Sequence, residues 1–221
     1  MASVKVFGSP SSAEVARVLV CLFEKDVEFQ LIRVDTYKGQ KRMPEYLKLQ
    51  PQGQALTFED GKMTLVDSRE ICRHITEKYV DQGNKDLLGT GTLERASIEQ
   101  WLQTEARSFD PPSSALVFHL AFAPLMGLEQ DQEVIEQSKR KLNNVLDIYD
   151  RRLQETRFLA GDNFTLADLS HLPNAQRLVS NAGCSPMIRS RKRVSRWWDE
   201  ISRRPSWQRV VEMQKEPLPV I

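Results

Sequence analysis

Strand signals are confined to the first third of the 221-residue chain, and this asymmetry limits the folds that the chain can adopt. Val4–Phe7 and Phe29–Val34 are short β-favouring runs. Between them, Ala13–Glu24 carries apolar residues at helical spacing. A strand, a helix and a second strand in this order predict a parallel βαβ unit.

A hairpin and a further helix complete the expected N-terminal domain. Gln54–Glu59 and Met63–Val66 flank Asp60 and Gly61, which form the strongest hairpin cue in the chain. A helical pattern then begins at Ser68. A βαβ unit followed by an antiparallel ββα unit matches the thioredoxin-like arrangement, although periodicity alone also permits other small α/β sheets.

The rest of the chain is expected to be helical. Residues 81–92 are rich in Gly, Asn, Asp and Thr, which indicates a linker between a first domain over 1–80 and a second over 93–221. Pro205 can begin a short last helix, because proline is tolerated at the first helical position. The other segments with helical periodicity are Leu93–Phe109, Asp131–Glu155, Thr165–Asn181 and Arg191–Ser202. The predicted fold class is therefore α/β plus all-α, a thioredoxin-like domain followed by an all-helical domain.

One capping signal in the second domain is sharp. Thr165 is placed to cap a helix, and Asp168 follows at the spacing from which a carboxylate reaches back to the cap amide. We interpret this pair as structural, stabilising the helix by about 1 kcal/mol.

Charge and cysteine content exclude several classes of protein. Lys plus Arg total 31 and Asp plus Glu total 30, so there is no global electrostatic signal for nucleic acid or an anionic membrane. Cys21, Cys72 and Cys184 are too sparse for a disulfide framework or a metal site. No apolar run approaches the roughly 20 residues that span a bilayer, and no signal peptide is recognised. A cytoplasmic location is the expectation.

Four stretches resemble segments of the plant phi-class glutathione transferases, and together they extend along essentially the whole chain. They are residues 5–25 (KVFGSPSSAEVARVLVCLFEK), 45–71 (EYLKLQPQGQALTFEDGKMTLVDSREI), 157–173 (RFLAGDNFTLADLSHLP) and 196–207 (RWWDEISRRPSW). The resemblance implies a homodimer that binds glutathione as co-substrate, without a metal or other cofactor. It also implies conjugation of glutathione to electrophilic apolar small molecules, or reduction of peroxides with it.

The resemblance assigns catalysis to Ser12, just after the first strand. Its hydroxyl would donate to the glutathione sulfur and favour the nucleophilic thiolate. From the local residues alone, the alternative is that Ser11 caps the helix, Glu14 completes a capping box and Ser12 is idle. If Glu14 faced the pocket, like-charge repulsion would raise the pKa of the sulfur and slow catalysis.

Six positions match the glutathione-binding residues of the family. They are Lys41, Arg42, Gln54, Ala55, Asp67 and Ser68. The basic pair would hold the glycine carboxylate, although adjacent charges are often a solvated loop. Gln54 and the Ala55 backbone would bond the peptide of the ligand. The last pair would bind the γ-glutamyl end, and the alternative for this pair is a helix cap.

The loop before the hairpin departs from the family pattern. Leu56 replaces a proline that follows a cis bond in the family, and Gln52 replaces a usual phenylalanine. A cis bond before a residue other than proline costs about 2.5–4 kcal/mol, so we expect a trans bond here. We also expect weaker glutathione binding, which Leu56→Pro would partly restore.

Apolar acceptors are expected between the active-site loop and the first helices of the second domain. The candidates are Pro10, Phe118, His119 and Phe122. The surrounding run, residues 115–126 (ALVFHLAFAPLM), is apolar on nearly all sides, which is more typical of a core than of a pocket. Two other functions stay open: a low-activity ligandin that carries flavonoid-like or other apolar molecules, and a structural interaction module.

Overall fold

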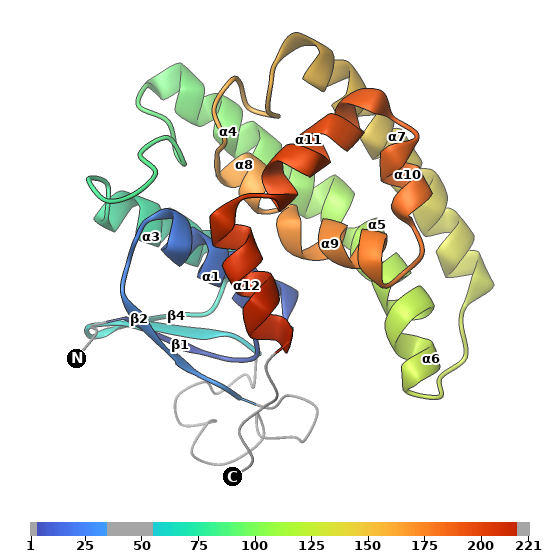
Figure 1. The fold of residues 1–221 in the computed structure, drawn as a ribbon, viewed down its shortest axis with the longest axis horizontal. Coiled ribbons are helices and arrows are strands. Elements are labelled where there is room, and N and C mark those ends of the chain that lie inside the picture. The colour runs from blue at the N-terminus through green and yellow to red at the C-terminus, as the bar shows by residue number, and fades with distance from the viewer. Residues whose placement is uncertain (1–3, 35–54, 216–221) are drawn as a thin grey trace. The chain divides into compact units, whose positions relative to one another are not determined.

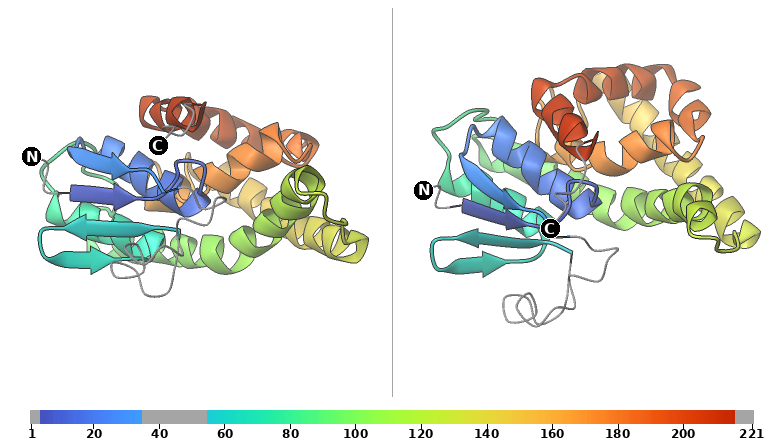
Figure 2. Two further views of the ribbon diagram at one scale, coloured as in Figure 1. Left: turned by 90° about the horizontal axis from the view of Figure 1, so that it is seen from below. Right: turned by 60° about the horizontal axis from the view of Figure 1, so that its bottom comes forward.

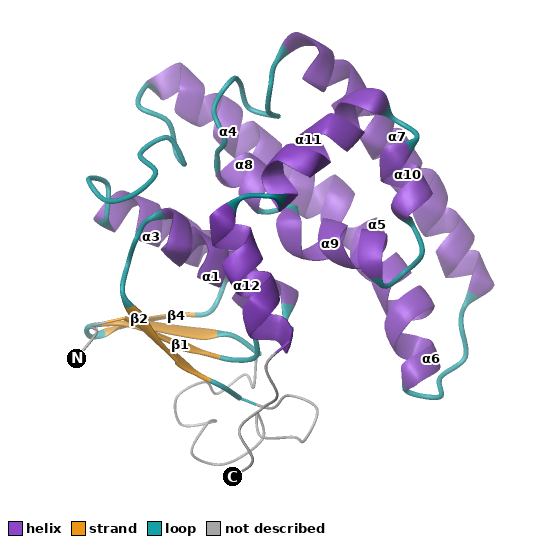
Figure 3. Cartoon of the chain, in the orientation of Figure 1, coloured by secondary structure: helices purple, strands orange, loops and turns teal. Residues whose placement is uncertain are grey.

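The chain forms two compact units. The computed structural model describes residues 4–34 and 55–215. One unit comprises Met1–Lys85 together with Pro205–Ile221, and the other comprises Asp86–Arg204. All the strands in the described residues belong to the first unit (Figure 3).

The first unit contains a four-stranded mixed sheet with the order β2-β1-β3-β4. The elements are β1 (Val4–Phe7), α1 (Ala13–Glu24), β2 (Phe29–Ile32), β3 (Thr57–Asp60), β4 (Met63–Leu65) and α3 (Ser68–Lys78). β1 pairs in parallel with β2 and antiparallel with β3, and β3 pairs antiparallel with β4. In the central register, Val6 lies between Leu31 and Phe58. The predicted βαβ unit followed by a ββα unit is therefore confirmed.

The predicted hairpin is also confirmed, with its turn after Asp60. Gly61 adopts φ +63°, a left-handed conformation that glycine reaches without steric cost. The strand before this turn is shorter than predicted among the described residues, because it begins at Thr57. Gln54, the predicted start of that strand, lies outside the described residues.

Helices cover one face of the sheet in the first unit. α1 and α3 pack together there, and α12 (Pro205–Lys215) lies alongside α1 (Figures 1 and 2). Trp207 and Val210 of α12 are fully buried, and the Ser206 hydroxyl donates to the Glu24 carboxylate at the end of α1. The expected ranges of 1–80 and 93–221 thus differ from the compact units, since the last helix joins the first unit.

The segment after α3 is fastened to the C-terminal end of α1. The buried Lys25 ammonium donates to the carbonyl oxygens of Val80 at 3.4 Å and Asn84 at 2.9 Å. The Asn84 side-chain amide donates to the second Glu24 carboxylate oxygen at 3.0 Å. Burial lowers the pKa of Lys25. Part of the segment expected to be a linker is therefore held to α1 by specific hydrogen bonds.

The second unit is helical throughout its regular structure. Its elements are α4 (Thr92–Thr104), the π-helical segment η2 (Glu105–Phe109), α5 (Asp110–Val117), the π-helical segment η3 (Phe118–Phe122), α6 (Ala123–Leu125), α7 (Gln132–Glu155), α8 (Leu166–Leu169), α9 (Leu172–Ser180), α10 (Ser185–Arg189) and α11 (Lys192–Ser202). The predicted helix over Thr165–Asn181 is divided into α8 and α9. Pro173 explains the division, because it lacks an amide hydrogen and its ring crowds the preceding turn.

The core of the second unit surrounds a buried histidine. The Nε2 atom of His171 lies 2.9 Å from the Tyr149 hydroxyl, and its Nδ1 atom lies 2.7 Å from the Ala167 carbonyl oxygen. The predicted capping pair is confirmed nearby, since the Thr165 amide donates to the Asp168 carboxylate at 3.1 Å. That carboxylate is fully buried, and burial raises the pKa of Asp168 to about 6.

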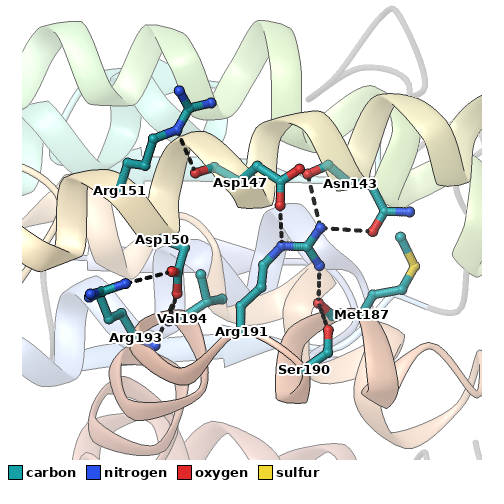
Figure 4. Close-up of polar contacts among 9 residues, drawn as sticks. All are labelled: Asn143, Asp147, Asp150, Arg151, Met187, Ser190, Arg191, Arg193 and Val194. Carbon is teal, nitrogen blue, oxygen red and sulfur yellow. Dashed lines mark hydrogen bonds and ion pairs between the residues drawn. The ribbon is translucent and has the colours of Figure 1, made fainter.

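Charged side chains join α7 to the start of α11 (Figure 4). The Asp150 carboxylate accepts from the amides of Arg193 at 3.0 Å and Val194 at 3.3 Å, so it caps α11 from another helix. Arg191 reaches back to α7, donating to the Asp147 carboxylate at 2.7 Å and to the Asn143 side chain at 3.1 Å. Arg191 and Arg193, which belong to a run of basic residues at positions 189–196, thus connect the start of α11 to α7. In the described ranges, no helix combines the length and apolar character needed to cross a bilayer.

Candidate active site

The loop between β1 and α1 is a tight turn that carries the predicted catalytic serine. The Ser12 amide donates to the Ser9 carbonyl at 2.8 Å, which closes a four-residue turn through Pro10 and Ser11. The Ser9 hydroxyl accepts from the Ser11 amide at 3.3 Å. Proline is favoured at the second position of such a turn because its φ is already fixed. Local chemistry therefore holds the loop that leads into α1.

Ser12 occupies the N-cap position of α1. Its backbone is extended, with φ −78° and ψ 137°, and its side chain makes no hydrogen bond to the helix. The alternative in which Ser11 caps the helix and Glu14 completes a capping box is therefore wrong, because the cap position lies one residue later. Glu14 is in the first turn and exposed. The Ser12 hydroxyl is thus not engaged by the helix, yet it lies at the positive end of the helix dipole.

The backbone of Ala55 lies against the same loop. Gly8 has φ +145°, and a Cβ atom on it would lie 2.5 Å from the Ala55 carbonyl oxygen. A glycine is therefore required for this close approach. There is no cis peptide bond in the described residues, so the bond between Ala55 and Leu56 is trans, as expected from the sequence. Leu56 itself is fully buried.

Asp67 and Ser68 lie at the start of α3. The exposed Asp67 carboxylate accepts from the amides of Arg69 and Glu70, each at 2.9 Å, so it acts as the helix cap. Ser68 is buried, and its hydroxyl accepts from the Arg17 guanidinium at 2.8 Å. The capping alternative thus holds for Asp67, while the predicted contacts of both residues with glutathione stay predictions.

Arg17 is a component of this region that the sequence reasoning missed. It lies on α1, is only 2% exposed, and joins α1 to the start of α3 through Ser68. A buried cation close to the start of a helix favours an anion there. The available signal was a single arginine within an otherwise apolar stretch of α1.

The predicted acceptor residues fall into two groups, one in each unit. Pro10 is buried in the first unit, and its carbonyl oxygen accepts from the Gln214 side-chain amide at 2.9 Å. Phe118, His119 and Phe122 all belong to η3 in the second unit. π-Helical segments are often found at functional sites.

The environment of η3 differs from the expected core. Phe118 is 41% exposed, while the Phe122 ring lies 5.4 Å from the Arg177 guanidinium. The His119 ring accepts from the Asp131 amide at 3.3 Å. The apolar run is buried on one side only, because Leu116 is fully buried whereas other residues of the run are exposed. The expectation of a core segment is therefore wrong for part of this run.

Several predicted site residues lie outside the described residues. They are Lys41, Arg42 and Gln54. Gln52, which departs from the family pattern, also lies outside the described residues. Within the described ranges, no group of three or more His, Cys, Asp or Glu side chains is arranged to hold a metal ion.

The chain combines a thioredoxin-like unit with a helical unit, and α1 of the first unit begins at Ser12, whose side chain does not cap the helix. These features are those expected of a glutathione transferase. Two family models match the chain: Glutathione S-transferase, N-terminal domain, over residues 2–77, and Glutathione S-transferase, C-terminal domain, over residues 111–205. The chain belongs to the glutathione S-transferase family.

The relatives identify the class within that family. Glutathione S-transferase F10 of Arabidopsis thaliana is 46% identical over 96% of this chain and 97% of its own length. The crystal structure of glutathione transferase F2 from Populus trichocarpa is 57% identical over 96% of this chain and 99% of that chain, with a TM-score of 0.93. Maize glutathione S-transferase I, solved in complex with an atrazine glutathione conjugate, is 28% identical over 98% of this chain and 100% of that chain, with a TM-score of 0.89. These similarities support the phi class.

Proposed function

We propose that the chain conjugates glutathione to electrophilic apolar acceptors and that Ser12 activates the thiol. The observation that carries the proposal is the Ser12 hydroxyl, which sits at the N-cap of α1 without capping it. A free thiol has a pKa near 8.5, so only a small fraction is nucleophilic thiolate at neutral pH. A hydroxyl that donates to the sulfur favours the anion without a general base.

The magnitudes are sufficient for this chemistry. Lowering the thiol pKa by about 2 units requires about 2.7 kcal/mol of preferential stabilisation of the thiolate. A hydrogen bond to a charged group supplies roughly 1.5–3 kcal/mol. The start of a helix adds roughly 0.3–1 kcal/mol. Ser12 at the start of α1 combines both contributions in one place.

The remaining groups of the loop and of α3 would orient the tripeptide. In this proposal the Ser68 hydroxyl, the positive end of the α3 dipole and the buried Arg17 guanidinium favour the γ-glutamyl carboxylate. Asp67 keeps a second carboxylate oxygen for the ammonium group, since both capping bonds go to Oδ1. The Ala55 backbone would pair with the cysteinyl main chain, and Lys41, Arg42 and Gln54 would hold the rest of the ligand.

The proposed acceptor is an apolar aromatic electrophile. Phe118, His119 and Phe122 of η3 offer partly exposed rings in the second unit, and Pro10 belongs to the active-site loop. The atrazine conjugate bound by the maize relative supports a chlorinated aromatic class of acceptor. Peroxide reduction would use the same activated thiolate.

Ser12→Ala tests the proposal, with Ser11→Ala as the matched control one residue away. Turnover of a chlorodinitrobenzene should fall by about 10- to 150-fold in Ser12→Ala, which corresponds to the loss of one charge-assisted hydrogen bond. The control should stay within about 2-fold of the parent, because Ser11 does not cap α1. Equal turnover of the parent and Ser12→Ala would refute the serine assignment.

Ligand carriage with little turnover is the second candidate function. Leu56 in place of the family proline favours it, because the neighbouring Ala55 backbone belongs to the proposed glutathione site. Displacement of a fluorescent apolar ligand at concentrations that give no measurable turnover would support this function.

We further propose a homodimer in the cytoplasm. The family resemblance supports both, and light scattering of the purified chain tests the first. A mass of twice 25.4 kDa is the expected result.

A further inference from the structure

The C-terminal helix of the first unit contacts the active-site turn directly. Gln214, in the last turn of α12, donates its side-chain amide to the Pro10 carbonyl oxygen at 2.9 Å. The two residues are 204 positions apart in the sequence. Pro10 lies two residues before Ser12, so the contact falls inside the turn that presents the proposed catalytic hydroxyl.

The helix that carries Gln214 is fixed along its length. Trp207 and Val210 are fully buried, and their spacing places Gln214 on the same helical face. At the far end, the Arg33 guanidinium donates to the Met213 carbonyl oxygen at 3.2 Å. The Gln214 side chain therefore extends from a backbone that is held at both ends of α12, and its hydrogen bond connects this fixed backbone to the active-site turn.

The contacted carbonyl belongs to the central peptide of the turn, whose amide donates to the Ser9 hydroxyl at 3.3 Å. The hydrogen bond from the Ser12 amide to the Ser9 carbonyl joins the first and last residues of the turn. The peptide between Pro10 and Ser11 lies at its centre, and the common turn types differ chiefly in the orientation of this peptide. The Ser9 hydroxyl holds the amide side of this peptide and Gln214 holds its carbonyl side, so the two contacts together select one orientation. Because the turn ends at Ser12 and α1 begins directly after it, that orientation also fixes the backbone from which the Ser12 hydroxyl extends.

We propose that Gln214 is a positioning residue for the transferase reaction, which holds the central peptide of the turn so that the Ser12 hydroxyl meets the glutathione sulfur. The inference rests on the proposed role of Ser12. Gln214 acts through the turn, so its effect appears in the ionisation of the bound thiol and in kcat. One neutral hydrogen bond corresponds to a factor of about 2 to 10 in the population of the correct turn.

Two substitutions distinguish the effect of the Gln214 hydrogen-bond donor from the effect of its side-chain packing. Gln214→Met keeps the length of the side chain and removes the amide, whereas Gln214→Lys keeps a donor. We expect Gln214→Met to lower kcat by about 3- to 10-fold and to raise the pKa of the bound thiol by roughly 0.5–1 unit. The KM for glutathione should stay within about 2-fold, and Gln214→Lys should restore most of kcat. Lys215→Ala is the control on the same turn, since Lys215 pairs with Glu212 at 2.7 Å.

A double-mutant cycle distinguishes this inference from the proposed function. In a Ser12→Ala background, Gln214→Met should change kcat by less than about 2-fold, because the hydroxyl that it positions is absent. If Gln214→Met keeps its full effect there, or lowers kcat without moving the thiol pKa, the positioning role is refuted. If Ser12→Ala alone matches the parent, the serine assignment fails instead. Thermal unfolding of every variant separates these effects from a loss of folded protein.

Discussion

Gly8→Ala perturbs the contact between the active-site loop and the Ala55 backbone. An added Cβ atom would lie 2.5 Å from the Ala55 carbonyl oxygen and 2.6 Å from the Val15 Cγ2 atom. Neither distance is tolerated by real side chains, so the backbone near Ala55 or the start of α1 has to move. Gly8 also has φ +145°, a conformation that alanine rarely adopts.

The expected loss of stability has two contributions, and a substitution at a second glycine, Gly61, measures one of them alone. Backbone strain of an alanine at position 8 amounts to about 1–3 kcal/mol, and overpacking by its Cβ atom adds about 1–3 kcal/mol. Gly61 has φ +63° in the hairpin turn, but a Cβ atom added to it would meet no atom within 4 Å, so Gly61→Ala carries strain alone. We therefore expect Gly8→Ala to lower the free energy of unfolding by about 2–6 kcal/mol and Gly61→Ala by about 1–2 kcal/mol.

Denaturant unfolding of the two variants and the parent measures these differences. Calorimetric titration with glutathione, under conditions where both variants are folded, adds the functional consequence. Displacement of the Ala55 backbone should weaken glutathione binding in Gly8→Ala, whereas Gly61→Ala should bind like the parent. If the two variants lose equal stability within about 0.5 kcal/mol, the close approach of Gly8 and Ala55 is not the constraint that the distances indicate.

Three further predictions concern stability. Asp150→Ala should lower the free energy of unfolding by about 1–2 kcal/mol at pH 7 in denaturant titrations, because the Asp150 carboxylate caps α11. Burial tends to raise the pKa of Asp150, but the Arg193 contacts outweigh it and lower the pKa, so this difference should vanish as the pH falls through the depressed pKa. Lys25→Met should speed amide hydrogen exchange around Asn84, because it removes the hydrogen bond to the Asn84 carbonyl oxygen. Unchanged exchange would show that this bond does not hold the segment to α1. The Asp168 carboxyl should titrate near pH 6 by NMR; because folding raises its pKa, its contribution to stability is present below about pH 4 and lost as the pH rises through about 6.

The fold was predictable where the determining chemistry is local. Asp60 and Gly61 specify a hairpin through the conformation that the glycine adopts, and Thr165 and Asp168 specify a cap through a spacing of three residues. The assignment of α12 to the first unit was not predictable, because it depends on contacts such as that of Ser206 with α1. The π-helical segments were also missed, since a shift in backbone hydrogen bonding leaves the apolar pattern nearly unchanged.

The candidate site shows the same division. The position of Ser12 after the first strand was predicted from the sequence, but the choice between Ser11 and Ser12 as the cap depends on backbone angles within the turn. The bond between Arg17 and Ser68 spans 51 positions, and the bond from Gln214 spans 204. Such contacts carry no periodic signal, so they require the folded arrangement.

The pKa of the thiol of bound glutathione directly measures whether Ser12 activates the thiol. Ultraviolet titration of the thiolate in the parent complex and in Ser12→Ala gives it without dependence on the acceptor. If the Ser12 hydroxyl stabilises the thiolate, the pKa of the bound thiol in the parent should lie about 2 units below that of free glutathione, and removal of the hydroxyl should raise it by at least about 1 unit. An identical thiol pKa in the two proteins would show that Ser12 does not activate the thiol.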